Sequence, residues 1–139
     1  MKQFVSAVTI MVRDYDEAIA YYTQALGFEI AEDAPQTAGK RWVLVRPPGA
    51  NECGLLLAKA KNEEERKAVG CQAGGRVCFF LHTDDLVRDY ARMKAWGVRF
   101  REEPRNEPYG RVAVFEDLYG NKWDLIQPSS VPEKLVMRR

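Results

Sequence analysis

The stretch VTIMVRDYDEAIAYYTQALGFEI, residues 8 to 30, decides the fold. It begins with an apolar run typical of a strand, and Asp14 then stands in a turn before residues with the 3.6-residue apolar spacing of a helix. Gly27 follows the helical pattern, at a place where a helix C-terminus needs a left-handed backbone. The stretch therefore predicts a strand, a helix and a second strand, in that order.

The same order recurs in FFLHTDDLVRDYARMKAWGVRF, residues 79 to 100. Aligning the two stretches at an offset of 71 keeps the apolar stripe in register, and one residue is lost before the second glycine, Gly97. At an offset of 70, residues 41 to 45 also match residues 111 to 115. An internal repeat of this length predicts two βαβββ modules.

Length and composition fit one ordinary globular domain, because the chain has 139 residues, 46% of them hydrophobic and 29% charged. We predict a single domain over residues 1–128, made of module one (4–60), a linker (61–75) and module two (76–128). The linker is charged and then glycine-rich, which favours an exposed connector with a short solvated helix over a lid. Residues 129–139 are expected to form a loosely ordered tail.

Charge and cysteine content exclude several classes of partner. Twenty-one basic residues nearly balance 20 acidic ones, so neither nucleic acid nor an anionic membrane surface is an expected partner. The sequence has no membrane-length apolar run and no signal-peptide pattern, which predicts a cytoplasmic protein. Cys53, Cys71 and Cys78 lack C-x-x-C spacing and are expected to be reduced thiols.

The repeat resembles the vicinal oxygen chelate superfamily, which includes glyoxalase I, bleomycin-resistance proteins, fosfomycin-resistance enzymes and extradiol dioxygenases. The resemblance is carried by the V-x-x-x-V-x-D-like opening of each module and by the hairpin motif D-x-x-G-N-x-x-D-L at residues 117 to 125, and it covers residues 4 to 128. It implies an α+β fold in which the two modules form a glyoxalase-like half-barrel with a concave ligand cavity. It also implies a homodimer, since related proteins often assemble their barrels across two chains.

The resemblance also locates a possible metal site. Family members that use a metal place their four ligands at positions that correspond here to Ala7, Gly54, Cys78 and Asp124. The first two residues have no side-chain donor, whereas a catalytic divalent ion needs about three suitable protein ligands. We therefore predict no cofactor. A slipped alignment that brings in Glu52 would leave a noncanonical divalent metal as the alternative.

Asp124 is the residue that we predict to be catalytic if chemistry occurs. A carboxylate in an apolar cavity has a raised pKa and can act as a general base or pair with a cationic ligand. The alternative is a structural ion pair with Lys122, Arg41 or Arg111. Both roles remain open at this point.

Strand alternation selects the other predicted ligand-binding residues. In the strand at residues 77 to 82, one face carries Cys78, Phe80 and His82, and the opposite face should meet the helices. His82 is the only histidine, with local hydrogen bonding as its alternative role, and Cys78 is more typical of a small buried residue than of a nucleophile.

Two aromatic residues and two arginines complete the predicted site. Trp42 and Tyr109 are expected to line the cavity, whereas Trp123 should lie in the core. Arg41 and Arg111 occupy equivalent positions in the two modules, where they could clamp a carboxylate or a phosphate or form ion pairs with Glu116, Asp117 or Asp124.

The favoured interpretation is a metal-independent small-molecule-binding protein of the glyoxalase and bleomycin-resistance type. Near-zero net charge favours an amphipathic or aromatic metabolite or drug as its ligand. The alternative is a metal-dependent lyase, isomerase or dioxygenase of the same superfamily that uses Asp124. A third interpretation is a homodimeric structural or regulatory module with a degenerate cavity.

Overall fold

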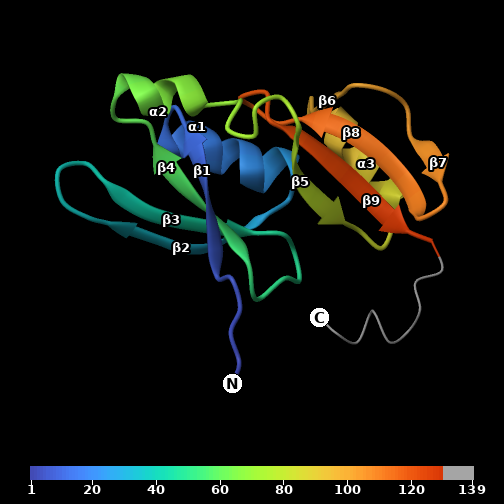
Figure 1. Cartoon of the computed structure of the whole chain (residues 1–139), viewed down its shortest axis with the longest axis horizontal. Helices are drawn as coiled ribbons and strands as arrows, with labels where there is room; N and C mark the ends of the chain where they lie inside the picture. The colour runs from blue at the N-terminus through green and yellow to red at the C-terminus, as the bar shows by residue number, and fades with distance from the viewer. Residues whose placement is uncertain (130–139) are drawn as a thin grey trace.

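A computed structural model of the chain describes residues 1–129 (Figure 1). Apart from Ser129, the predicted loosely ordered tail at residues 129–139 lies outside the described residues.

Module one forms a four-stranded sheet in the order β1-β4-β3-β2, with β1 parallel to β4 and the other pairs antiparallel. The carboxylate of Asp14 starts its helix by accepting a 2.9 Å hydrogen bond from the amide of Glu17. The helix ends before Gly27, whose φ of 77° confirms the predicted left-handed position. The elements are β1 (Ala7–Val12), α1 (Tyr15–Ala20), the π-helical turn η1 (Tyr21–Ala25), β2 (Glu29–Pro35), β3 (Arg41–Arg46) and β4 (Gly54–Lys59).

Module two repeats this topology in a sheet of order β5-β9-β8-β6, with the short β7 also paired to β8. Its elements are β5 (Val77–His82), α3 (Leu86–Ala95), β6 (Arg99–Phe100), β7 (Arg105–Glu107), β8 (Gly110–Glu116) and β9 (Lys122–Pro128). Gly97 follows α3 with a φ of 88°. The predicted α+β fold with two βαβββ modules is confirmed. No strand pairing joins the two sheets within residues 1–129, so they do not close a barrel.

The helices and an aromatic cluster join the two modules. Helices α1 and α3 lie behind the sheets in Figure 1, and the core is packed between them and the strands. Trp123 of β9 is 3% exposed, which confirms its predicted core position. Its ring contacts Phe28 and Tyr22 of module one as well as Phe79 and Phe115 of module two. One core therefore serves both modules.

The linker contains α2 (Glu63–Ala68), which begins at the side-chain cap Asn62 and buries none of its residues. Beyond α2 the chain passes the outer edge of β1, where the Gln72 side chain accepts a hydrogen bond from Met11 N and donates one to Thr9 O, both at 2.9 Å. The amide thereby satisfies backbone groups that an edge strand leaves unpaired. No helix among the described residues is long and apolar enough to span a bilayer.

Candidate functional site

Each sheet has one face turned away from the helices, which we call the open face of that module. The two faces follow from strand alternation, since residues next to one another in a strand point to opposite sides. On β9, Trp123 and Leu125 belong to the core, so Asp124 belongs to the open face of module two. Its cross-strand neighbours there are Phe80 of β5 and Val114 of β8.

Asp124 carries a buried polar atom without a partner. Its Oδ1 is inaccessible to solvent and makes no hydrogen bond within residues 1–129. Burial raises the pKa of the Asp124 carboxyl, and the nearby guanidinium of Arg105 partly opposes that effect. An acceptor of this kind is a strong candidate for contact with a ligand, because leaving it unsatisfied costs about 1–3 kcal/mol.

None of the ion-pair partners expected for Asp124 is observed. Lys122 Nζ donates to the carbonyl of Gly75 at 3.0 Å. Arg105 of β7, which the sequence did not indicate, is the cation whose charge acts on Asp124, and it is itself bonded to Glu102 and Glu107.

Arg41 and Arg111 do not form the clamp that their equivalent positions suggested. The Arg41 guanidinium pairs at 2.8 Å with Asp16 and at 2.8 Å with Asp33, and it lies over the ring of Tyr15 on the helix side. Arg111 pairs in register with Gln127, three positions from Asp124 on β9, and so lies on the face opposite to it. The predicted ion pairs of these arginines with Glu116, Asp117 or Asp124 are likewise not observed among the described residues.

The open face of module one is largely apolar. Trp42, Leu44 and Arg46 alternate along β3 with the core residues Val43 and Val45. Trp42 is 38% exposed, and its Nε1 donates a hydrogen bond to Glu32 on β2. The face is completed by side chains of β1 and β4: Thr9, Met11, Leu56 and Ala58.

The remaining predicted ligand-binding residues are spread over module two. Phe80 is 65% exposed and lies beside Asp124. His82 is exposed two positions further along the same face, about 7 Å away by strand rise. Tyr109 is 52% exposed in the turn between β7 and β8. Cys78 lies at a register shift of β5, and burial raises the pKa of its thiol, which disfavours a reactive thiolate.

The four positions that correspond to metal ligands do not fit a catalytic metal. Ala7 lies directly opposite Gly54, so two neighbouring ligand positions lack any side-chain donor. A Cβ at Gly54 would lie 2.9 Å from the carbonyl oxygen of Val45 and 3.0 Å from Cγ of Arg46, so the space is already filled. Glu52 is exposed and precedes β4. Within residues 1–129, no three His, Cys, Asp or Glu side chains come together in a way that could hold a metal ion.

The first residue of the D-x-x-G-N motif is a structural centre. Asp117 is 1% exposed, and its carboxylate accepts six hydrogen bonds. Its Oδ1 accepts the three backbone amides of residues 119 to 121. Its Oδ2 accepts from Tyr22 Oη, Asn121 Nδ2 and Trp123 Nε1. The carboxylate therefore holds the β8–β9 turn in place and does not serve to bind a ligand.

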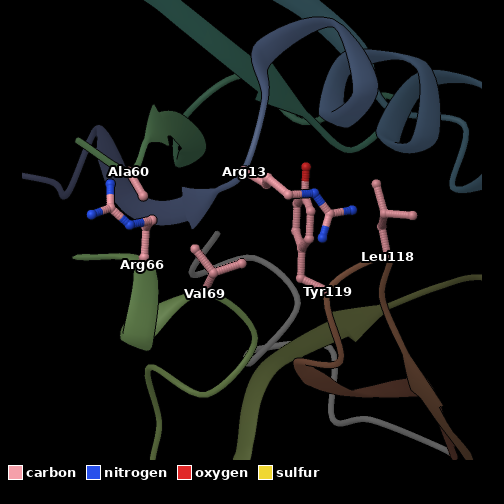
Figure 2. Close-up of a pocket in the computed structure, with 6 residues that line it drawn as sticks. All are labelled: Arg13, Ala60, Arg66, Val69, Leu118 and Tyr119. Atoms are coloured by element: carbon pink, nitrogen blue, oxygen red, sulfur yellow. The ribbon is translucent and has the colours of Figure 1, made fainter. Parts of the chain in front are cut away.

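Two cavities lie away from Asp124. One, of about 380 Å³, has Arg13, Val69, Tyr119 and Arg66 of α2 in its wall (Figure 2). Its polar groups are already engaged, because Arg13 pairs with Glu17 at 3.1 Å and lies over the Tyr119 ring, whose hydroxyl also donates to Glu17.

The other cavity, of about 490 Å³, lies between the two modules. It is bordered by Pro47 and Pro48 of module one and by Arg88 and Asp89 of α3. His82 is the one predicted site residue in the wall of either cavity. The other predicted residues lie on sheet faces or in turns, so the open faces remain the better candidate site.

Solved structures with this fold include one that is described as an antibiotic-binding protein. The crystal structure of TnmS3, an antibiotic binding protein from Streptomyces sp. CB03234, is 33% identical, with a TM-score of 0.76 over 92% of this chain and 98% of that chain. The crystal structure of UcmS2 is 34% identical, with a TM-score of 0.78 over 91% of this chain and 98% of that chain.

Sequence comparisons agree with the fold. An uncharacterized protein from Shewanella frigidimarina (strain NCIMB 400) is 52% identical over 128 residues, which span 91% of this chain and 95% of that protein. A family model described as the Glyoxalase/Bleomycin resistance protein/Dioxygenase superfamily matches residues 5–125. The resemblance seen in the repeat is thereby confirmed, and the chain belongs to the glyoxalase/bleomycin resistance protein/dioxygenase superfamily.

Proposed function

We propose that this protein binds an amphipathic or aromatic small molecule on its open faces without the help of a metal. The observation that carries the proposal is the buried, unpartnered Oδ1 of Asp124 beside the 65% exposed ring of Phe80. An aromatic surface with one unsatisfied acceptor suits a ligand that has a flat apolar body and a cationic or hydrogen-bond-donating group.

The relatives support this class of ligand. TnmS3, which is 33% identical, is described as an antibiotic binding protein, so a drug-like molecule is a reasonable ligand here as well. The chemistry of the metal-ligand positions supports metal independence, because Ala7 and Gly54 offer no donor. Three free cysteines also suit the cytoplasm as the place of action.

We further propose that two copies assemble so that the open faces are enclosed. Phe80 and Trp42 are large apolar side chains left exposed on these faces, which is costly for a monomer. Sedimentation equilibrium should give about twice the chain mass. A Phe80→Glu variant should shift the protein toward monomer, and a purely monomeric wild type would contradict this part of the proposal.

The proposed binding can be tested with two matched probes, naphthylmethylamine and the neutral naphthalenemethanol. The amine should bind wild type about tenfold more tightly, because it can donate a charge-assisted hydrogen bond to Asp124. Asp124→Asn should remove that preference and leave alcohol binding unchanged, whereas Phe80→Ala should weaken both probes. Failure of both probes to change protein fluorescence or melting temperature would contradict the proposal.

Chelation separates this proposal from metal-dependent lyase, isomerase or dioxygenase chemistry. Binding of the amine should survive exhaustive dialysis against a chelator. Loss of binding on chelation, with recovery on adding a divalent metal, would favour the enzyme alternative.

A further inference from the structure

Arg46 is a cation on the open face of module one without a partner in the described part of the chain. Its Nε is buried and makes no hydrogen bond within residues 1–129, and no carboxylate there forms an ion pair with it. Several other arginines form ion pairs, such as Arg41 with Asp33 and Arg88 with Asp89. A buried guanidinium N–H without an acceptor is as costly as the unpartnered acceptor of Asp124.

The place of Arg46 depends on the missing side chain of Gly54. An added Cβ at Gly54 would lie 3.0 Å from Arg46 Cγ and 3.0 Å from Leu44 Cδ1. The stem of Arg46 therefore packs over Gly54, opposite which Ala7 lies on β1. Metal-using relatives would have metal ligands at this position. Here the aliphatic part of the Arg46 side chain lies there instead, and it ends in a positively charged guanidinium.

Two carboxylates on β2 are near Arg46 in the sheet but do not satisfy it. Glu29 lies directly opposite Arg46 in the β2–β3 register, is exposed, and forms no hydrogen bond with it. Glu32 accepts the indole N–H of Trp42 instead. The guanidinium of Arg46 thus has no acceptor among the described residues, and its side chain is partly exposed toward a molecule lying on the face.

We propose that Arg46 binds an oxyanion of the ligand, so that the ligands of this protein are aromatic molecules bearing a carboxylate or a similar acidic group. A guanidinium suits this role because its planar N–H donors match the two oxygens of a carboxylate. The inference rests on the proposed binding of an aromatic ligand to the open faces. In this inference Arg46 contacts a negatively charged group of the ligand, whereas Asp124 contacts a cationic or hydrogen-bond-donating group.

The test compares naphthoate with naphthalenemethanol, which differ in the acidic group, at low ionic strength and by titration calorimetry. Wild type should bind naphthoate about tenfold more tightly than the alcohol. Arg46→Gln should remove that preference and leave the alcohol unchanged, and Arg46→Lys should restore part of it. Arg111→Gln is the matched control, because it removes an exposed arginine on the helix-side face. It should leave both affinities unchanged.

The outcomes separate this inference from the proposed function. If the alcohol binds and Arg46→Gln leaves naphthoate affinity unchanged, the role of Arg46 is wrong and the binding proposal stands. If none of the naphthyl probes binds, the binding proposal itself fails.

Glu29→Gln provides an independent check. Because Glu29 is not the partner of Arg46, this variant should unfold at the same urea concentration as wild type and should not weaken naphthoate binding. Strong non-additivity between Glu29→Gln and Arg46→Gln in the free energy of unfolding would reveal a pair between these side chains and would overturn the inference.

Discussion

The hydroxyl of Tyr22 donates a 2.7 Å hydrogen bond to Oδ2 of Asp117, although 95 residues separate them in the chain. Tyr22 lies in the helical segment of module one, and Asp117 lies in the β8–β9 turn of module two. Burial and the neighbouring Asp117 raise the pKa of Tyr22 well above its ordinary value, so the hydroxyl stays protonated and donates. This bond joins the two modules through Asp117, whose carboxylate accepts six hydrogen bonds.

Asp117→Ala is expected to lower the free energy of unfolding by about 4 kcal/mol or more, because it leaves several buried donors unsatisfied at once. Tyr22→Phe removes one of the six bonds and should cost about 1–2 kcal/mol. Urea unfolding followed by tryptophan fluorescence gives both values. Equal losses for the two variants would show that the turn does not depend on the carboxylate.

Asp124→Asn should stabilise the protein at neutral pH. Burial raises the pKa of the Asp124 carboxyl above its ordinary 3.8, so between the two values the folded state holds more protons than the unfolded chain. The contribution of this group to stability therefore falls as the pH rises through that window. The variant, which cannot ionise, should gain about 1 kcal/mol or less at about pH 7.

At a pH below the ordinary pKa of the carboxyl that gain should disappear, because the group is then protonated in both the folded and the unfolded state. Asp84→Asn is the exposed control and should change stability by less than about 0.5 kcal/mol at either pH. A gain of the same size at both pH values would assign the effect to packing.

Gly97→Ala should cost about 1 kcal/mol, since the residue has a φ of 88° and no atom within 4 Å of an added Cβ. Gly27→Ala should lower the free energy of unfolding by more, because its Cβ would lie 2.7 Å from Nη2 of Arg92. The guanidinium of Arg92 donates to the carbonyls of Gln24 and Ala25 and would have to move. Thermal unfolding of the two variants gives the comparison. The reverse order would mean that Arg92 contributes nothing at this helix end.

Gln72→Ala should expose the edge of β1, at a cost of about 1–2 kcal/mol for two lost hydrogen bonds. Hydrogen exchange of the Met11 amide should accelerate in this variant, while the amide of Leu57 in β4 should keep its protection unless global unfolding dominates. Gln72→Glu retains the acceptor for Met11 and should slow exchange relative to the alanine variant.

The fold could be predicted from the sequence because the two halves of the repeat predict the same order of elements. Helix ends at Gly27 and Gly97, strand alternation around Trp123 and the closing hairpin all indicated the same two modules. Each of these features depends on local chemistry, such as a left-handed C-cap or a buried face, which a single sequence displays directly.

The site was only partly predictable. Alternation placed Asp124 on the face opposite Trp123, and the same rule applied to Trp42 and Leu44 would have indicated Arg46. The pairing of Arg111 with Gln127 depends on the register of the β8–β9 hairpin, which its turn determines and residue types alone do not.

Arg105 was missed for a related reason. It lies in a three-residue strand between Pro104 and Pro108, and prolines at this spacing are typical of a loop. Short edge strands carry too few residues for alternation to be recognised. Its influence on Asp124 arises from tertiary proximity.

The contact of Gly54 with the backbone has an evolutionary implication. Any side chain introduced there meets the carbonyl oxygen of Val45 at 2.9 Å, so histidine or glutamate could not enter this corner without moving the β3–β4 pairing. A lineage that lost its metal-ligating side chain at the position of Gly54 would therefore need several simultaneous substitutions to regain it. Redesign of this scaffold as a metalloenzyme should begin from the strand backbone, before any donor is chosen.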